Sequence, residues 1–101
     1  MSKNFRTFNL AVNFYKQSLC QKLPAILRSQ LTRAASSIAL NLAEARGRHG
    51  LKDQLRFFHI AMGSVRECQA ILTLADLTQT PAWLTLDALA AHLYNLIKNA
   101  K

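Results

Sequence analysis

The fold is decided by residues 24–50, which read PAILRSQLTRAASSIALNLAEARGRHG. Apolar residues recur there at the three- and four-residue spacing of an amphipathic helix, and at 100° per residue they share an arc of about 100°. This predicted core face consists of Leu27, Leu31, Ala34, Ala35, Ile38, Leu42 and Ala45. Pro24 suits the first turn of such a helix, where a missing N–H costs nothing. We therefore predict a helix from Pro24 to about Arg46.

Three further helices are predicted on the same grounds. The first runs from Phe5 to Leu23, with an apolar stripe made of Phe5, Phe8, Val12, Tyr15 and Leu19. The third follows the glycines of the GRHG turn, from Leu51 or Lys52 to about Leu77. Its apolar face consists of Leu55, Phe58, Ala61, Met62, Val65, Cys68 and Leu72. The fourth starts with Thr80 as N-cap and Pro81 in the first turn, and its apolar side is Leu86, Leu89, Leu93, Leu96 and Ile97.

Length and composition agree with a small helical protein. The chain has 101 residues, half of them hydrophobic, and only three Gly and two Pro. This is enough for one domain with its own core and too short for two, so we expect a single domain over residues 1–101. Amphipathic helices with short connections bury their stripes most simply as an antiparallel up-down-up-down four-helix bundle. The predicted fold class is all-α.

The second helix is apolar beyond its core arc. Ala39, Leu40 and Ala43 project away from the predicted core face. In an isolated protomer they would be exposed to water, although scattered exposed apolar residues are ordinary. We expect them to form a second packing surface in a homo-oligomer.

A polar stripe flanks the core face of the second helix, and a similar stripe with Gly63 lies on the third. We expect the two stripes to meet, within a subunit or across a subunit interface, in a structural network made of Arg33, Ser37, Asn41, Glu44, Ser64 and Glu67. In it, Arg33 would pair with Glu67 and Asn41 would bridge Glu44 and Ser64. A glycine inside a helix costs about 1 kcal/mol relative to alanine, so Gly63 indicates a close approach of another group.

The candidate binding site is a basic cluster around the glycine-rich turn. It consists of Arg46, Arg48, His49, Lys52 and Arg56. Arg46 and Arg48 also suit the negative end of a helix dipole, but Lys52 stands at the positive end of the next helix, where the dipole disfavours it. Thirteen Lys and Arg against five Asp and Glu give a formal charge of +8, which can serve solubility alone or a polyanionic partner. We expect the cluster to bind nucleic acid.

Other functions find little support in the sequence. The three histidines are dispersed, the two cysteines lack metal-ligand spacing, and GRHG lacks the Lys-Ser/Thr of a phosphate-binding loop. We therefore expect no catalytic site, no metal and no cofactor, and we expect both cysteines to be buried thiols. No signal peptide or membrane span is convincing, so a cytoplasmic location is the default expectation.

Two motifs give the chain a family resemblance. The motifs are Ser-Ile-x-x-Asn-Leu-Ala-Glu (37–44) and Arg-Phe-Phe-x-Ile-Ala-x-Gly-Ser-x-x-Glu (56–67), and the stretch that carries the resemblance extends from Gln30 to Glu67. The chain thereby resembles the 23S rRNA-intervening sequence protein family, also called four-helix bundle proteins. The resemblance implies a four-helix bundle that assembles as a homopentamer. A related branch, the accessory variability determinant proteins of diversity-generating retroelements, forms basic pentameric barrels that bind nucleic acid and a reverse transcriptase.

Two hypotheses of function follow. In the first, the protein is a non-enzymatic oligomeric scaffold that presents basic turns to the backbone of RNA or DNA. In the second, it is a protein-interaction adaptor whose basic surface docks an acidic patch of a partner enzyme such as a reverse transcriptase.

Overall fold

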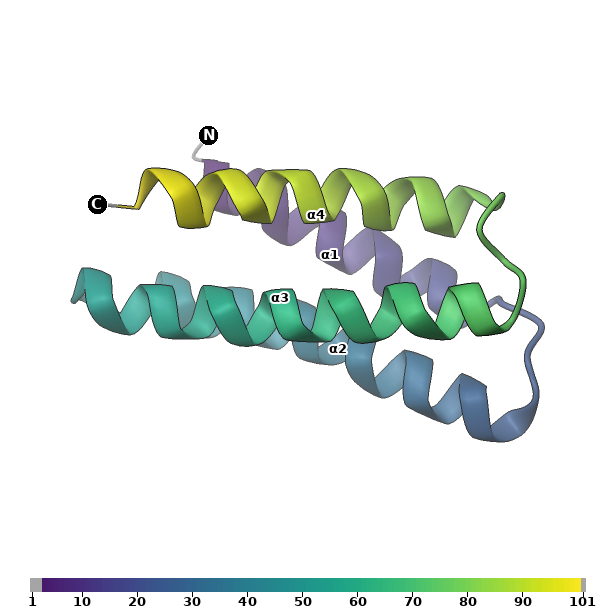
Figure 1. Ribbon diagram of the computed structural model, residues 1–101. Coiled ribbons are helices and arrows are strands. Elements are labelled where there is room, and N and C mark those ends of the chain that lie inside the picture. Colours follow the sequence, from purple (N-terminus) through teal and green to yellow (C-terminus); the bar gives the residue numbers. More distant parts are fainter. Residues whose placement is uncertain (1–2, 101) are drawn as a thin grey trace.

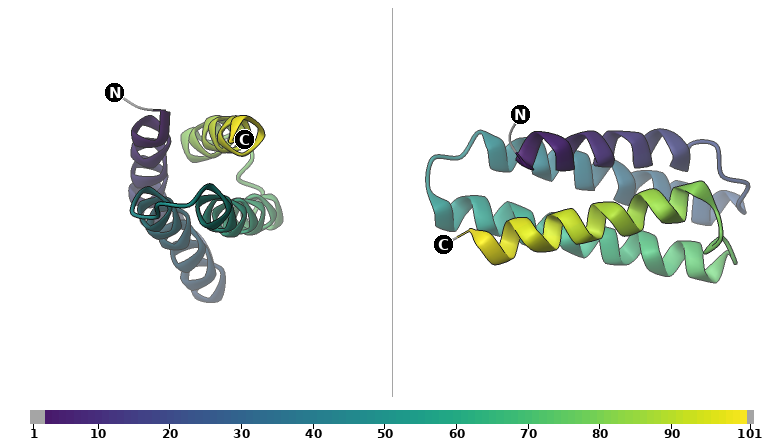
Figure 2. Two further views of the ribbon diagram at one scale, coloured as in Figure 1. Left: turned by 90° about the vertical axis from the view of Figure 1, so that its left-hand side faces the viewer. Right: turned by 90° about the horizontal axis from the view of Figure 1, so that it is seen from above.

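The protein is described by a computed structural model over residues 3–100, and this range forms four α-helices without strands. They are α1 (Lys3–Ser18), α2 (Ala25–Arg46), α3 (Leu51–Leu74) and α4 (Pro81–Asn99). Each helix packs against two others, in the cyclic order α1, α2, α3, α4 (Figure 1). The α2–α3 connection lies at one end of the bundle with the start of α1 and the end of α4, and the other two connections lie at the opposite end (Figure 2). The all-α prediction with four helices is confirmed.

The core face predicted for α2 is the face that the structure buries. Six of its seven members are buried, and Leu27 is half-buried against the same core. Alanine at three of these positions lets α2 lie close to its neighbours, and α2 and α3 share the most extensive helix contact of the bundle. Pro24 is the N-cap rather than the first helical residue, which moves the predicted start by one position.

The core face predicted for α1 is wrong by about a quarter of a turn. The fully buried residues are Thr7, Ala11, Phe14 and Ser18, whereas Leu19 is 53% exposed. The predicted stripe lies beside the buried face, where Phe8 and Tyr15 are only partly covered. Small side chains bring α1 close to the bundle axis, and Ser18 tolerates burial because its hydroxyl donates to the Tyr15 carbonyl oxygen at 2.6 Å. The helix also ends at Ser18, earlier than the predicted Leu23.

Local hydrogen bonds fix the ends of α3 and α4. After the C-cap Ala75, Asp76 has φ of 60°, and the N–H groups of Asp76 and Leu77 donate to the carbonyl oxygens of Thr73 and Leu72. This pattern is a Schellman motif, which ends α3 before the predicted Leu77. The predicted N-cap of α4 is confirmed, because the Thr80 hydroxyl accepts from the Trp83 N–H at 3.2 Å.

A short chain of polar contacts couples α2 to α3. The Ser37 hydroxyl oxygen accepts from the Ser64 hydroxyl at 2.9 Å and from Asn41 Nδ2 at 3.1 Å. Within one protomer, neither Arg33 nor Glu67 forms an ion pair among the described residues, and both side chains are exposed, so their pairing across a subunit interface stays a prediction. These two residues lie farther out on the helix surfaces than the serines. Glu44 contacts Arg48 one turn later in place of Asn41.

The two cysteines lie in opposite environments. Cys68 is fully buried in the core, as predicted, but Cys20 is exposed in the α1–α2 connection, so the prediction for Cys20 is wrong. Burial, assisted by the nearby Glu67 carboxylate, raises the pKa of Cys68 to about 12.

None of the helices within residues 3–100 is both long and apolar enough to cross a membrane.

We predict that the serine contact contributes to stability. The Ser37→Ala substitution should lower the free energy of unfolding by about 1 kcal/mol, because Ser64 and Asn41 both lose a partially buried partner. Ser29→Ala, at an exposed position of the same helix, is the matched control and should change stability by less than about 0.5 kcal/mol. Urea unfolding followed by circular dichroism measures both, and equal values for the two variants would contradict the proposed coupling.

We also predict that only one thiol reacts readily. At pH 8 the Cys68 thiol stays protonated, because its pKa is about 12, and it is shielded by the core. A chromogenic disulfide reagent should therefore titrate one thiol per chain in the folded protein and two in denaturant. Cys20→Ser should abolish the native-state reaction, and a rapid reaction of that variant would show that Cys68 is accessible.

Candidate nucleic-acid interface

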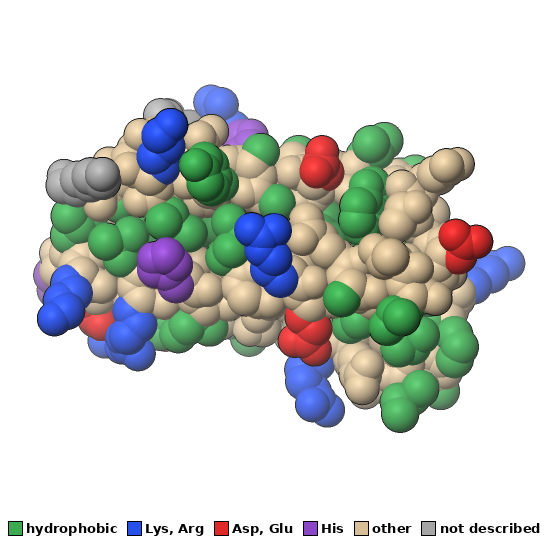
Figure 3. Space-filling view, in the orientation of Figure 1, with side chains coloured by type: hydrophobic (Ala, Val, Ile, Leu, Met, Phe, Trp, Pro, Cys, Tyr) green, Lys and Arg blue, Asp and Glu red, His purple; other side chains and the backbone are tan. Residues whose placement is uncertain are grey.

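The basic turn, defined as Arg46, Arg48, His49, Lys52 and Arg56, is assembled at one end of the bundle. α2 ends at Arg46, the chain crosses to α3 through residues 47–50, and α3 begins at Leu51. Gln54 holds the crossing in place, since its Nε2 donates to the Arg48 carbonyl oxygen at 2.9 Å. In the view of Figure 3, Lys and Arg side chains gather toward the end of the bundle where α3 begins. The structure thus brings together the five residues predicted from the sequence.

Two of the arginines are oriented by an aromatic ring. The guanidinium carbons of Arg48 and Arg56 lie 4.8 Å and 4.4 Å from the ring centroid of Phe57. Phe57 belongs to the core and is almost completely buried, so its ring is a fixed support. Cation–π contacts of this kind contribute on the order of 0.5–1 kcal/mol at exposed sites. They also limit the directions in which the two guanidinium groups can point.

Two carboxylates neutralise part of the basic turn. Arg48 donates to Glu44 at 2.9 Å and lies 3.5 Å from Asp53, and Arg56 donates to the same Asp53 through two nitrogens at 3.0 and 3.1 Å. Four charged groups therefore form one connected chain, in the order Glu44, Arg48, Asp53 and Arg56. With Glu44 and Asp53 included, the basic turn carries four Lys and Arg against two acids, a net charge of +2 with neutral histidine.

These ion pairs are weak enough to be exchanged. The side chains of Arg48 and Glu44 are 40% and 55% exposed, and Arg56 is 58% exposed. Exposed ion pairs contribute about 0–1 kcal/mol each, since water screens them and ordering the side chains costs entropy. A phosphate, with several acceptor oxygens, can therefore displace a carboxylate from either arginine at little cost. The acids orient the arginines more than they block them.

The other three members are free of ion pairs among the described side chains. Arg46 lies over the ring of Phe5, with 5.2 Å between the guanidinium carbon and the ring centroid. His49 and Lys52 are exposed and lie on either side of Gly50, the N-cap of α3. Gly50 has no side chain to accept from the first N–H groups of that helix. A surface hollow of ≈ 380 Å³ lies there, lined by Gly50, Lys52, Asp53 and Arg56.

Sequence reasoning missed the groups that organise the basic turn. Asp53 and Phe57 were not among the predicted site residues, and Glu44 was placed in the α2–α3 network. The signal was present in the spacing: Glu44 precedes Arg48 by four residues and Asp53 precedes Arg56 by three, both of which place opposite charges side by side on a helix. The contacts of Arg48 with Asp53 and Phe57 cross the turn and depend on tertiary structure.

The guanidinium and ammonium groups of the basic turn can attract, orient and hold an anion. Within the described residues, no group of three or more His, Cys, Asp and Glu side chains lies close enough together to hold a metal ion.

Comparison with known proteins adds a family to this description. No curated protein and no solved structure matches the chain. The description of the family that does match is "23S rRNA-intervening sequence protein", and the match extends over residues 4–99, from the first turn of α1 to the last residue of α4. Because that match includes nearly the whole sequence, the chain belongs to the 23S rRNA-intervening sequence protein family.

Proposed function

We propose that the protein is a non-enzymatic, oligomeric scaffold, built from up-down-up-down helical bundles, that binds the phosphate backbone of RNA or DNA through its basic turn. The observation that carries this proposal is the gathering of four cationic side chains and a histidine at one end of the bundle, with two of the arginines held on Phe57. Long-range attraction from the formal charge of +8 adds to it.

The chemistry of the basic turn favours backbone contacts over base recognition. Arginine can contact phosphate oxygens with two parallel N–H groups, and Lys52 adds a mobile point charge. The basic turn consists of the last residue of α2, the connection 47–50 and the start of α3, whereas proteins that read bases in the major groove lay a helix or a two-stranded ribbon into it. Binding is therefore largely independent of sequence, and it is driven by counterion release.

Self-assembly is the second part of the proposal, and we propose a homopentamer. Leu40 is 67% exposed on α2. It borders a hollow of ≈ 200 Å³ between α1 and α2, lined by Val12, Tyr15, Ser36, Ala39 and Leu40. A second copy that fills this hollow removes apolar surface from water. Five copies repeat the basic turn five times, so that weak phosphate contacts act together on one polymer.

Gly63, on α3, also supports self-assembly. A Cβ atom placed on Gly63 meets nothing within 4 Å, so packing inside the protomer does not require a glycine there. The sequence-based expectation of a close approach at Gly63 is thus not met within one copy. A neighbouring copy at this position explains the glycine.

We predict that the basic turn provides most of the salt-dependent affinity at this end of the molecule. Changing Arg46, Arg48, Lys52 and Arg56 together to Gln should weaken binding of a 30-nucleotide mixed-sequence RNA by at least tenfold, an order-of-magnitude expectation. The slope of log K against log salt should decrease by about 1 for each phosphate contact removed. Fluorescence anisotropy at several salt concentrations measures both quantities.

The variant must keep the melting temperature and oligomer mass of the original protein for the comparison to hold. Unchanged affinity in such a variant would remove the basic turn from the binding surface. Salt-sensitive binding of an acidic partner protein, with no binding of RNA or DNA, would contradict nucleic-acid binding and favour the adaptor hypothesis.

We predict opposite effects of Gly63→Ala on the protomer and on assembly. Alanine is the better helix former, so the substitution should stabilise the isolated helix by about 0.5–1 kcal/mol, and nothing within the protomer opposes it. If a neighbouring copy approaches Gly63, the added methyl group should shift the mass measured by light scattering toward smaller species. An unchanged mass together with raised stability would place Gly63 outside the contact.

A further inference from the structure

The net positive charge of the chain is concentrated in its first 43 residues, because these contain no acidic residue. Six of the thirteen Lys and Arg lie there, whereas all five Asp and Glu lie at residue 44 or later. The first 43 residues therefore carry a formal charge of +6, and the remainder of the chain carries +2. The six cations are Lys3, Arg6, Lys16, Lys22, Arg28 and Arg33. α1 contains no acidic residue at all.

Part of this charge lies on one exposed face of α1. Arg6, Asn9, Asn13 and Lys16 follow each other at steps of three, four and three residues, and all four side chains are exposed. We call them the outer face of α1. At 1.5 Å per residue the outer face is about 15 Å long, and this length of duplex axis carries roughly four phosphates on each strand, at about 3.4 Å of axis per phosphate. Asparagine amides, like Lys and Arg, donate to phosphate oxygens.

The cations of the outer face differ from Arg48 and Arg56 of the basic turn because they are in no ion pair among the described side chains. All three ion pairs found there involve Arg48 or Arg56. A phosphate that binds Arg6 or Lys16 therefore displaces only water, whereas one that binds Arg48 or Arg56 competes with a carboxylate.

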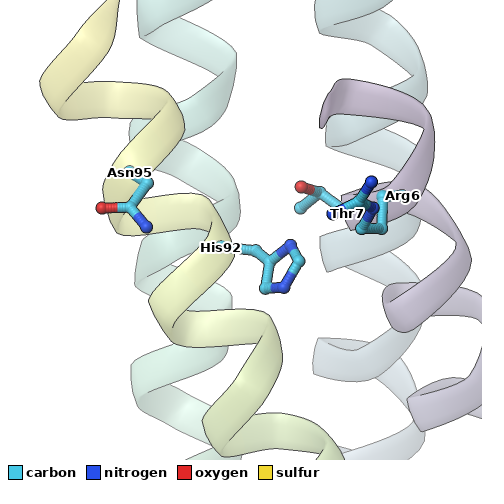
Figure 4. Close-up of a pocket in the computed structure, with 4 residues that line it drawn as sticks. All are labelled: Arg6, Thr7, His92 and Asn95. Carbon is cyan, nitrogen blue, oxygen red and sulfur yellow. The ribbon is translucent and has the colours of Figure 1, made fainter. Parts of the chain in front are cut away.

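A small polar pocket adjoins the outer face at Arg6. It has a volume of ≈ 160 Å³, lies between α1 and α4, and is lined by Arg6, Thr7, His92 and Asn95. Figure 4 shows the His92 ring extending from α4 toward the α1 residues Arg6 and Thr7, with Asn95 one turn away on α4. The guanidinium, ring and amide nitrogens of this lining can all donate hydrogen bonds. Among the described residues no carboxylate lines the pocket, and the chemistry of its lining suits a phosphate group.

The outer face and the basic turn adjoin at the same end of the bundle. Arg46, from the basic turn, lies over the ring of Phe5, which directly precedes Arg6. Both views in Figure 2 agree that the start of α1 lies at the end of the bundle where α2 connects to α3. A polymer that contacts the basic turn can therefore continue along α1.

We propose that the outer face of α1 binds the phosphate backbone of nucleic acid, with one phosphate seated in the pocket lined by Arg6, His92 and Asn95. This inference rests on the proposed nucleic-acid function and extends its surface from the turn to a full helix. The outer face contains no apolar side chain, whereas protein interfaces have apolar centres and membrane-surface helices have an apolar face to insert. A row of cations and amides therefore fits a polymer of phosphates better than it fits a protein interface or a membrane surface.

The test compares two pairs of charge removals of equal size. The variant with Arg6→Gln and Lys16→Gln should bind a 30-nucleotide RNA, or duplex DNA of similar length, about tenfold more weakly at moderate salt, and its salt slope should fall by about 1 per cation. The control carries Arg66→Gln and Lys98→Gln, which remove two exposed cations from α3 and α4 and should reduce affinity by less than threefold, a rough bound for the change in net charge alone. Melting temperature and oligomer mass should match the unmodified protein in both.

A third variant tests the pocket without removing charge from the outer face. His92→Phe keeps a ring of similar size, removes the donors of the ring and leaves the formal charge unchanged, and it should weaken RNA binding about threefold with an unchanged fold.

Two results would overturn the proposal for α1. The first is an equal loss of affinity in the two charge-removal pairs. The second is a loss of binding in the basic-turn variant without any loss in the α1 variant, a result that leaves the proposed function intact. Absence of RNA and DNA binding by the unmodified protein would overturn both.

Discussion

The burial of the small-residue face of α2 against α1 and α3 is the constraint on which the rest of the structure depends. Alanine at positions 34, 35 and 45 lets neighbouring helices approach closely, and Leu31, Ile38 and Leu42 fill the space between them. This contact sets the rotation of α2 about its axis. Ser37 is thereby turned toward Ser64 of α3, Leu40 toward solvent, and Arg46 toward the ring of Phe5 on α1.

The basic turn is a consequence of this rotation combined with the short α2–α3 connection. Only residues 47–50 separate the two helices, so Arg48 reaches Asp53 and Phe57 on α3 while it contacts Glu44 on α2. The connection arranges cations, acids and an aromatic ring within one small region. Because the ion pairs are exposed, their main effect is to reduce the number of conformations available to the arginines before an anion binds.

Much of the fold could be predicted from the sequence, and the failures have identifiable causes. The faces of α2, α3 and α4 were predicted because hydrophobicity and burial coincide on them, as at Leu42, Val65 and Leu89. On α1 they diverge: Thr7 and Ser18 are buried for their size, and the more apolar neighbouring stripe is left at the edge of the core. The position of the basic turn was predictable from spacing, but its neutralisation by Asp53 required the geometry of the turn. The uneven distribution of charge along the chain is visible in the sequence, but the rotation of α1 that exposes Arg6 and Lys16 together depends on the burial of its small residues.

The packing of α1 through its small residues Thr7, Ala11 and Ser18 has a mechanical consequence. Three of its four fully buried residues are small and two are hydroxyl-bearing, so this helix removes less apolar area from water than α2 or α3, and its detachment costs correspondingly less free energy. α1, which carries Arg6 and Lys16, is thus held by less apolar burial than α2 or α3 and can shift or tilt more readily than either of them. A surface with that mechanical property can adapt to a kinked or irregular polymer.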